Sequence, residues 1–593
     1  MKMLNLKRLS KQMSGQYGQK VICSQKGSSI LLEGNVAEWT DVVAAGKMAA
    51  EIKGIKGVIN KIECASVKKK RKAGGELTEN VLKDRRVDVL IIGGGIIGCS
   101  IARELSKWDL DICLVEKEPD LAMHASSRND GMIHPGLVPS PGSMKAKYNA
   151  KGNGMYETLS RELDFEYKRV GSLLLFDNRW LAPAYPILAS RAEKNGVPST
   201  EFLTGKKLKR FVNSKDAPSL NKSLESKWAV YIPSTGIVSP YKTTIAVCEN
   251  AILNGTRLFL NTEVLSFERE NDTIISCKTT KGDIHAKIII NCAGTASDEV
   301  AELAGDRFFT IHPRKGTILM IDRKRGHLTN TVLSMPNIIG KKDTKGGGIV
   351  PTVEGNLLVG PDAEEQPYKE DYSTSMCHID AIVNQHFRLL EGIGKKDIIT
   401  YFAGTRASTY LEDFIVEWSD TISNLFHVAG IQSPGLASAP AIAEDVSEKV
   451  VSKLKRMKDV REKVNWQATR KGIPRLAQMD PEQRSVYIIK RPDYGEIVCR
   501  CEEISKGEIR DALHSPIPVK TVDGVKRRVR AGMGRCQGGF CKPLVVEIIA
   551  EELQMDPLDI TKKGQDSYIL MRDVAVVENE KADSREEGDG NVV

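Results

Sequence analysis

The chain has 593 residues with 41% hydrophobic and 27% charged side chains, the balance of a soluble globular protein. This length suggests roughly three to four units that each bury a core. The net charge of +9 is spread thinly except at "KKKRK", residues 68–72. We interpret this cluster as a solvated linker, with contact to an anionic membrane or nucleic acid as the alternative. No run reaches the ~18 apolar residues of a spanning helix and no signal-peptide core is present, so we expect a cytoplasmic protein that binds no nucleic acid.

Residues 1–64 are predicted to form a small α+β unit. A strand at "SSILLEG" is followed by helical apolar spacing in "EWTDVVAAGKMAAEI" and by a second strand at "KGVINKIE". This pattern resembles the BON domain, a family often linked to membrane-surface or polymer binding. The resemblance implies peripheral contact with a membrane, whereas the alternative is a packing or dimerisation appendage without a ligand. A basic linker, residues 65–86, follows.

A glycine-rich turn follows the buried apolar strand Val87–Ile92. Gly93, Gly95 and Gly98 stand in G-x-G-x-x-G spacing before a helix, and a second strand ends on Glu116. The glycines allow a tight turn, close approach to a pyrophosphate and close packing of helix on strand. Glu116 is at the distance expected for hydrogen bonds to an adenosine ribose. The segment therefore predicts a dinucleotide site, with an empty nucleotide-fold core as the alternative.

FAD is favoured over NAD because the chain does not continue as repeated strand and helix units. It enters the loop "HASSRNDGMIHPGLVPSPGSMKAK", and later shows a buried strand in "HAKIIINCAG" and a strand, turn and helix in "LFHVAGIQSPGLASAPAIAEDVSEKV". Segments such as "TRLFLNTEVLSFERENDTIISCKTT" predict antiparallel strands joined by polar turns. Further candidates for binding the flavin are Ser126, Ser127, Arg128, Asn129, Ala293, Gly294 and Gly430. The first four could instead only cap the loop and the helix.

The predicted fold class is α/β. A FAD-binding nucleotide fold is interrupted by an antiparallel-sheet substrate domain over residues 87–450. A linker over 451–490, a small helical cluster domain over 491–560 and a tail over 561–593 complete the chain. Residues 87–450 resemble the FAD-dependent amino-acid and hydroxy-acid oxidoreductases, which include glycine oxidase, L-2-hydroxyglutarate dehydrogenase and glycerol-3-phosphate dehydrogenase. The motifs "IIGGGIIGCSIARELS", "IIINCAG" and "AGIQSPG" carry the resemblance.

Four cysteines near the C-terminus form two tight pairs. They stand as C-x-C and C-x4-C, at Cys499, Cys501, Cys536 and Cys541. Four thiolates can hold either a 2Fe-2S cluster or a zinc ion; we favour the cluster because zinc would have no redox role beside a flavin. "VCRCEEISKGEI" with "GMGRCQGGFC" resembles the bacterioferritin-associated-ferredoxin type of 2Fe-2S domain, which implies that these four cysteines ligate the irons.

The substrate of such an enzyme needs a base and a clamp for its anionic group. His134, in the loop expected to pass the flavin, is the candidate base, or else stabilises the loop by a hydrogen bond. Arg406 in "YFAGTRAS" resembles a glycerol-3-phosphate dehydrogenase segment whose arginine binds the substrate anion; the alternative is a structural ion pair, for example with Asp413. Lys315 and Lys145 are weaker candidates for the clamp.

The leading hypothesis is a FAD and 2Fe-2S dehydrogenase that oxidises a small anionic alcohol. Because the cluster carries single electrons, we expect them to pass to a partner protein subunit or a quinone. "AGIQSPGLASAP" departs from the "GGKLxTYR" segment of glycerol-3-phosphate dehydrogenases, so glycerol 3-phosphate is favoured only narrowly over a 2-hydroxy acid such as 2-hydroxyglutarate. An amine or amino-acid dehydrogenase and a non-catalytic electron-transfer subunit stay open. Covalent attachment of the flavin through a histidine such as His124 is undecided.

Overall fold

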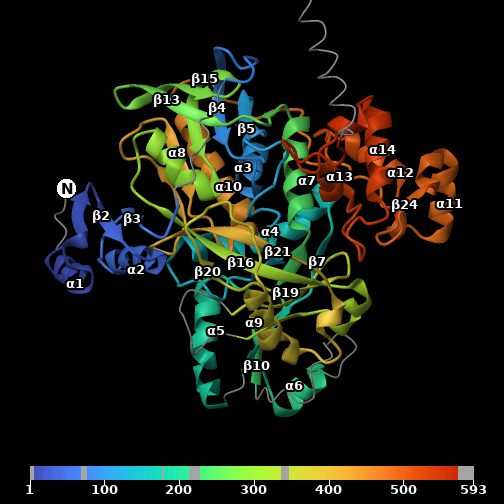
Figure 1. Cartoon of the computed structure of the whole chain (residues 1–593), viewed down its shortest axis with the longest axis horizontal. Coiled ribbons are helices and arrows are strands. Elements are labelled where there is room, and N and C mark those ends of the chain that lie inside the picture. The colour runs from blue at the N-terminus through green and yellow to red at the C-terminus, as the bar shows by residue number, and fades with distance from the viewer. Residues whose placement is uncertain (1–5, 69–76, 177–178, 213–227, 336–345, 572–593) are drawn as a thin grey trace, which may run out of the picture. The chain divides into compact units, whose positions relative to one another are not determined.

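The computed structural model describes residues 6–68, 77–176, 179–212, 228–335 and 346–571 (Figure 1). The chain divides into two compact units, Met1–Gly472 and Ile473–Val593. Most of the basic cluster at 68–72 and of the predicted C-terminal tail lies outside the described residues. Among the described residues, no helix has the length and apolar character needed to cross a membrane.

A three-stranded sheet with two helices opens the first unit. Its elements are α1 (Lys7–Tyr17), β1 (Val21–Lys26), β2 (Ser29–Val36), α2 (Trp39–Ala50) and β3 (Val58–Cys64). Central β2 is antiparallel to β1 and parallel to β3. Leu9 and Met13, one helical turn apart on α1, are buried in its core. The structure thus contains the predicted strand, helix and strand, and adds α1 and β1, which were not predicted. We call residues 6–64 the N-terminal unit.

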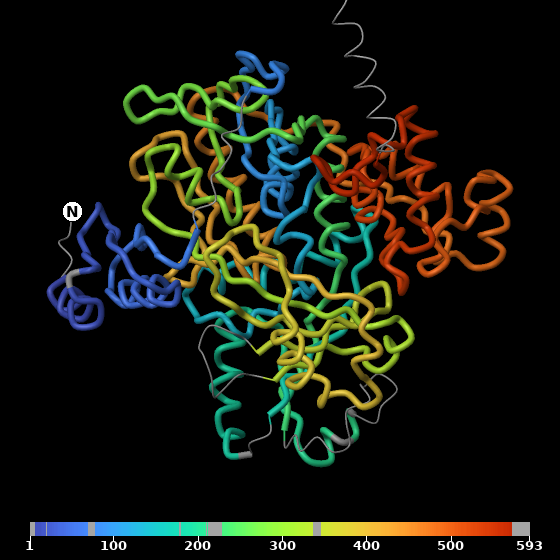
Figure 2. The backbone as a smooth tube through the Cα atoms, viewed as in Figure 1, coloured from blue at the N-terminus to red at the C-terminus, as the bar shows by residue number. Residues whose placement is uncertain are grey.

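The nucleotide sheet assembles stretches that are far apart in the sequence (Figure 2). Its strands are β4 (Arg85–Ile92), β5 (Ile112–Val115), β12 (Arg257–Phe259), β13 (Val264–Glu270), β14 (Thr273–Thr279), β15 (Gly282–Asn291), β22 (Ile415–Trp418) and β23 (Leu425–Ala429). The helices of this part are α3 (Ile96–Leu105), α4 (Met144–Leu163), α7 (Pro240–Leu253), α8 (Ser297–Leu303) and α10 (Gly435–Leu454). Strands β12, β5, β4, β15 and β23 run parallel, as expected for a nucleotide fold.

The antiparallel segment 256–280 does not belong to the substrate sheet. β13 and β14 form the predicted hairpin, but β14 pairs with β15 and so extends the nucleotide sheet, while β12 pairs in parallel with β5. The reason is the tight connection between β14 and β15, where Thr279 pairs with Gly282, which keeps the hairpin beside β15.

The substrate sheet is a separate nine-stranded layer. Its strands are β8 (Ser172–Phe176), β9 (Glu201–Thr204), β10 (Trp228–Ile232), β16 (Ile311–Ile321), β17 (Val332–Ser334), β18 (Gly348–Pro351), β19 (Leu357–Gly360), β20 (Glu364–Glu365) and β21 (Ile398–Thr409). All of its pairings are antiparallel except that of β17 with β8. Nearby are α5 (Tyr185–Lys194), α6 (Gly205–Val212), α9 (Met376–His386) and a small sheet of β6 (Met132–Ile133), β7 (Tyr167–Arg169) and β11 (Gly236–Val238).

The second unit is a small helical fold. It contains α11 (Pro481–Lys490), β24 (Ile497–Cys499), β25 (Ile504–Ser505), α12 (Lys506–Leu513), α13 (Val522–Val529) and α14 (Lys542–Leu553). Its core includes Ile509, Val525 and Ile549, together with the cysteines Cys499 and Cys541. Ser505 and Glu508 form a reciprocal cap at the start of α12, which fixes the helix beside the first cysteine pair.

Candidate functional site

Three parallel strands of the nucleotide sheet end at one edge. The register aligns Ile92 of β4 with Asn291 of β15, and Asn291 with His427 of β23. Four of the candidate flavin-binding residues lie within three residues of these strand ends, at Gly93, Ala293, Gly294 and Gly430. The carboxyl edge of such a sheet is where nucleotides bind in this class of fold.

The turn between β4 and α3 leaves no room for side chains. Gly93 has a φ of +112°, and a Cβ atom there would lie 2.5 Å from the carbonyl oxygen of Cys292. A Cβ atom on Gly98 would lie 2.1 Å from the carbonyl oxygen of Gly93. This cradle brings the N-terminus of α3, with its free N–H groups, to the sheet edge and fits the pyrophosphate of a dinucleotide.

Glu116 follows β5 and is buried beside the cradle. Its carboxylate accepts hydrogen bonds from the backbone N–H groups of Gly94 (2.6 Å) and Glu118 (2.9 Å). Burial nevertheless raises the pKa of Glu116 above its ordinary value. The position suits the predicted role of accepting hydrogen bonds from a ribose.

The loop after Glu116 places its four predicted residues differently. Ser126 Oγ accepts a hydrogen bond from the N–H of Ile96, at the start of α3. Ser127 and Asn129 donate to carbonyl groups of the loop itself. Arg128 donates to carbonyl groups of the loop and of β21, and its guanidinium lies over a tyrosine ring. Only Ser126 is thus seen at the helix N-terminus, whereas the other three brace the loop.

Both ring nitrogens of His124 have partners. Nδ1 contacts Tyr372 and Nε2 lies 2.9 Å from Glu118. These contacts hold the imidazole between the side chains of Tyr372 and Glu118.

Two arginines face each other across β16 and β21. Arg314 is paired with Arg406 in the register, so the two side chains project from the same face of the sheet. Arg314 is 3% exposed and is neutralised by Glu365 at 2.9 Å and Glu412 at 2.6 Å. Its charge is therefore already compensated inside the protein.

Arg406 donates only to backbone carbonyl groups, those of Lys315 (3.4 Å) and Asp362 (3.0 Å). No carboxylate among the described residues forms an ion pair with it. Gly316 provides the space for the guanidinium, because a Cβ atom there would lie 2.7 Å from Nη2. Burial and the neighbouring Arg314 lower the pKa of Arg406, and the more distant carboxylates of Asp362, Asp130 and Glu365 offset only part of this effect. A half-buried cation of this kind is suited to an anionic ligand.

His134 follows β6 and is held in place through its backbone. Its carbonyl oxygen accepts hydrogen bonds from Asn149 (2.7 Å) and Asn153 (3.2 Å), both buried on α4. Its Nε2 lies 3.3 Å from Oγ of Ser433. The predicted base is thus a positioned imidazole with a hydroxyl neighbour.

Two residues adjacent in the chain, Gln432 and Ser433, connect His134 to the face that bears Arg406. Ser433 follows Gln432, whose side chain accepts from Ser408 (2.9 Å) and donates to Glu412 (2.7 Å). Ser408 lies two residues from Arg406 on the same strand and therefore on the same face. The segment Gln432–Ser433 thus contacts both the predicted base and the strand that carries the predicted clamp.

The two weaker clamp candidates, Lys315 and Lys145, differ in position. Lys315 alternates with Arg314 and projects to the opposite face, where it pairs with Asp371 (3.1 Å). Lys145 contacts the carbonyl group of Glu412, and burial lowers its pKa. Asp413 accepts from the backbone N–H groups at the start of α4 and does not pair with Arg406.

In the structure each cysteine of the C-x-C motif lies beside one cysteine of the C-x4-C motif. Sγ of Cys501 lies 3.7 Å from Sγ of Cys536, and Cys499 is hydrogen-bonded to Cys541. A zinc ion would need all four sulfurs about 3.8 Å apart. However, no three of these four sulfurs lie within 4.8 Å of one another. Among the described residues, the group of three possible ligands that meets this distance is Glu118, His124 and Glu370. Two separated pairs fit the two irons of a 2Fe-2S cluster.

Backbone N–H groups favour the thiolate forms that bind iron. The hydrogen bond from Cys541, followed by those from the N–H groups of Gly532 and Glu502, lowers the pKa of Cys499. The N–H of Phe540 is the main cause that lowers the pKa of Cys536. Thiolate, the ligating form, is therefore favoured at Cys499 and Cys536, whereas the hydrogen bond to Cys499 raises the pKa of Cys541 and burial raises that of Cys501.

A family model described as FAD dependent oxidoreductase matches residues 88–449, more than half of the chain. The chain belongs to this family. A second model, BFD-like 2Fe-2S binding domain, matches residues 497–551, which include all four paired cysteines. This FAD dependent oxidoreductase therefore binds FAD and carries a 2Fe-2S cluster.

Named relatives of this oxidoreductase act on glycerol phosphate. It is 40% identical to a glycerol 3-phosphate dehydrogenase of Caloramator mitchellensis, over 82% of this chain and 98% of the relative. It is 31% identical to a glycerol 3-phosphate oxidase of Mycoplasma genitalium, over 64% of this chain and 97% of the relative. A solved structure of L-alpha-glycerophosphate oxidase from Mycoplasma pneumoniae with FAD bound matches with a TM-score of 0.59 and 26% identity, covering 65% of this chain and 98% of that one. The predicted family and the predicted cluster domain are confirmed.

Sequence reasoning missed three members of the oxidoreductase site. Ser433, Arg314 and Glu412 each contact residues far away in the sequence, so spacing alone did not single them out. Signals for two of them were nevertheless present: Ser433 stands in the quoted "AGIQSPG" turn before a helix, and Arg314 precedes Lys315 in "HPRKGTILM".

Proposed function

We propose that this protein is a glycerol-3-phosphate dehydrogenase that passes electrons through its 2Fe-2S cluster to a partner protein subunit or a quinone. The observation that carries the proposal is Arg406, a half-buried cation without a carboxylate partner among the described residues. The relative at 40% identity supports phosphate as the anion. A guanidinium binds phosphate through paired hydrogen bonds.

Different residues of the proposed site bind the substrate and accept its proton. Arg406 holds the phosphate of the substrate. His134 accepts the proton of the C2 hydroxyl group at Nε2, the nitrogen that lies 3.3 Å from Oγ of Ser433 before substrate binds. When bound, FAD supplies the two-electron acceptor and the cluster a carrier of single electrons.

The cluster favours a dehydrogenase over an oxidase, because a one-electron carrier serves an acceptor other than oxygen. A 2-hydroxy acid is the second candidate substrate, since L-2-hydroxyglutarate dehydrogenases are also relatives, for example that of Caenorhabditis briggsae at 28% identity over 62% of this chain and 94% of the relative. The higher identity to the glycerol 3-phosphate enzyme favours the phosphate.

Arg406→Ala is expected to raise the KM for glycerol 3-phosphate about a hundredfold. Loss of a charge-assisted bond costs about 2.7 kcal/mol, and each 1.4 kcal/mol is a factor of ten. Steady-state kinetics with an artificial one-electron acceptor measures the change. Arg406→Lys should recover part of the affinity, because a lysine keeps the charge without the planar fork.

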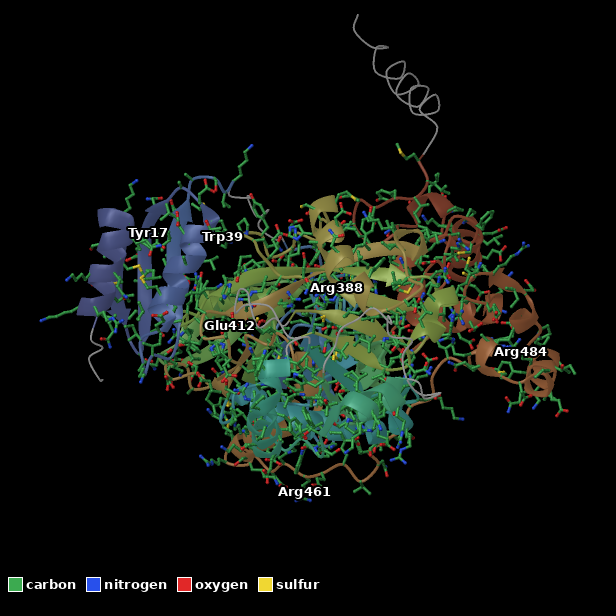
Figure 3. The ribbon with its side chains drawn as sticks, turned by 90° about the horizontal axis from the view of Figure 1, so that it is seen from below. Tyr17, Trp39, Arg388, Glu412, Arg461 and Arg484 are labelled. Carbon is green, nitrogen blue, oxygen red and sulfur yellow. The ribbon has the colours of Figure 1, made fainter. Side chains whose placement is uncertain are left out.

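Arg461→Ala is the matched control, since the side chain of Arg461 is 81% exposed and pairs with Asp459, two residues away in the chain (Figure 3). It should leave KM unchanged. If Arg406→Ala keeps the KM of the natural enzyme while binding its full complement of FAD, the anion is held elsewhere and the proposed clamp is wrong.

We further propose that the N-terminal unit is BON-like and brings a cytoplasmic enzyme to the membrane surface. The proposal rests on the quoted sequence pattern and on the basic residues 68–72 that follow the unit. The full-length protein should sediment with anionic phosphatidylserine vesicles at low salt and less at 0.5 M salt, because screening weakens surface attraction. Equal sedimentation with neutral and anionic vesicles, or none with either, counts against it.

A further inference from the structure

The N-terminal unit packs against the substrate sheet so closely that two of its residues must be glycine. A Cβ atom on Gly46 would lie 2.2 Å from the ring of Tyr410, which continues β21. A Cβ atom on Gly57 would lie 2.2 Å from the carbonyl oxygen of Phe308, just before β16. Contacts this close require complementary surfaces.

Asn60 connects the two surfaces by hydrogen bonds. Its amide group donates to the hydroxyl oxygen of Tyr410 (2.9 Å) and to the carbonyl group of Val42 (2.9 Å). Its backbone N–H donates to Thr310, immediately before β16 (2.9 Å). One buried residue of the N-terminal unit therefore contacts the chain next to both strands that carry the facing arginines.

Tyr410 also contacts the face of the substrate sheet that bears Arg314 and Arg406. Its ring, 6% exposed, stacks on His312 with centroids 4.4 Å apart. His312 Nδ1 lies 2.9 Å from Glu365, and Lys47 of the N-terminal unit lies 3.3 Å from the same carboxylate. His312, Arg314 and Lys47 together lower the pKa of Glu365 to about 2. The carboxylate is therefore held by charges from both sides of the interface.

Further contacts lead from Glu365 toward the segment beside the proposed base, His134. Glu365 binds Arg314, and Arg314 binds Glu412. Glu412, labelled in Figure 3, accepts from Gln432, the neighbour of Ser433. A series of hydrogen bonds and ion pairs thus leads from the N-terminal unit to Gln432, whose neighbour in the chain, Ser433, contacts His134.

We propose that the N-terminal unit is a positioning element of the active site. By holding Tyr410 through Asn60 and Gly46, and Glu365 through Lys47, it fixes β16 and β21 so that Arg314 stays neutralised and Arg406 alone faces the anion. The inference rests on the proposed function. The family model begins at residue 88, so the matched family region does not include this unit.

The test uses full-length Asn60→Ala, Tyr410→Phe and the double variant. Tyr410→Phe removes only the hydroxyl group and leaves the ring between Gly46 and His312. Each single variant should raise the KM for glycerol 3-phosphate about fivefold, as for one lost buried hydrogen bond. kcat per bound flavin should change less than twofold. The double variant should be no worse than the worse single, since both remove one interaction.

Lys61→Ala is the matched control. Lys61 is next to Asn60 on β3 and also binds outside the N-terminal unit, but its ion pair with Glu302 on α8 is exposed on both sides. Such pairs contribute little, so KM should not change. Equal rises of KM in Lys61→Ala and Asn60→Ala would reflect a loosened interface and would overturn the positioning role, as would an unchanged KM in Asn60→Ala and Tyr410→Phe.

Calorimetry with inorganic phosphate separates this inference from the proposed function. The dissociation constant for phosphate should rise in Asn60→Ala and Tyr410→Phe but not in Lys61→Ala. If the natural protein binds phosphate but does not oxidise glycerol 3-phosphate, the proposed substrate is wrong, and the phosphate constants of the variants decide the inference. If it binds no phosphate, both proposals are wrong.

Discussion

Replacement of His134 by glutamine is expected to slow the reduction of the flavin by glycerol 3-phosphate about a thousandfold. Glutamine can still hydrogen-bond to Ser433, but it cannot accept a proton at neutral pH, and general base catalysis contributes roughly 10²–10⁴-fold. The backbone should not move, because Asn149 and Asn153 hold the carbonyl group of residue 134 and not its side chain. Anaerobic stopped-flow measurement of flavin absorbance follows this step.

The KM and the affinity for phosphate should stay close to those of the natural enzyme, because Arg406 is untouched. His285→Gln serves as the control, since His285 on β15 contacts Ile275 on β14 and Asp84 just before β4, which are not part of the proposed site. A rate for His134→Gln within a factor of ten of the natural enzyme would mean that another group takes the proton.

Replacement of Cys536 by alanine is expected to abolish electron transfer to one-electron acceptors while the substrate still bleaches the flavin. Sγ of Cys536 lies 3.7 Å from that of Cys501, so the change removes one of the two ligands proposed for one iron. The first compact unit, which contains the glycine cradle and the substrate sheet, is unchanged. EPR of the dithionite-reduced protein should show no 2Fe-2S signal.

Cys377→Ala is the matched control because this exposed thiol lies on the substrate domain. It should keep both the EPR signal and acceptor turnover. If Cys536→Ala loses the EPR signal but reduces the acceptor at the natural rate, electrons leave the flavin directly and the cluster is not on the path.

The sequence predicted best what depends on local spacing. Gly93, Gly98 and Glu116 belong to one strand, turn and helix, so their arrangement follows from about thirty neighbouring residues. The C-x-C and C-x4-C motifs likewise lie in two short segments. The sequence did not show which cysteine of one motif lies beside which cysteine of the other.

Features that depend on strand register were not predictable. The face shared by Arg314 and Arg406, and the exclusion of Lys315 from it, follow from pairing between strands about ninety residues apart. The contact between His134 and Ser433 joins residues 299 apart. The hairpin of β13 and β14 had a correct local pattern, but nothing in that pattern showed which sheet it would join.

Anaerobic titration of the purified full-length protein with glycerol 3-phosphate, followed by flavin absorbance and then EPR, tests the central claim most directly. We predict rapid bleaching of the flavin and the appearance of a reduced 2Fe-2S signal at substrate concentrations that leave L-2-hydroxyglutarate and amino acids without effect. Bleaching by L-2-hydroxyglutarate in preference to glycerol 3-phosphate, or no bleaching of a fully loaded flavin by any of these compounds, would contradict it.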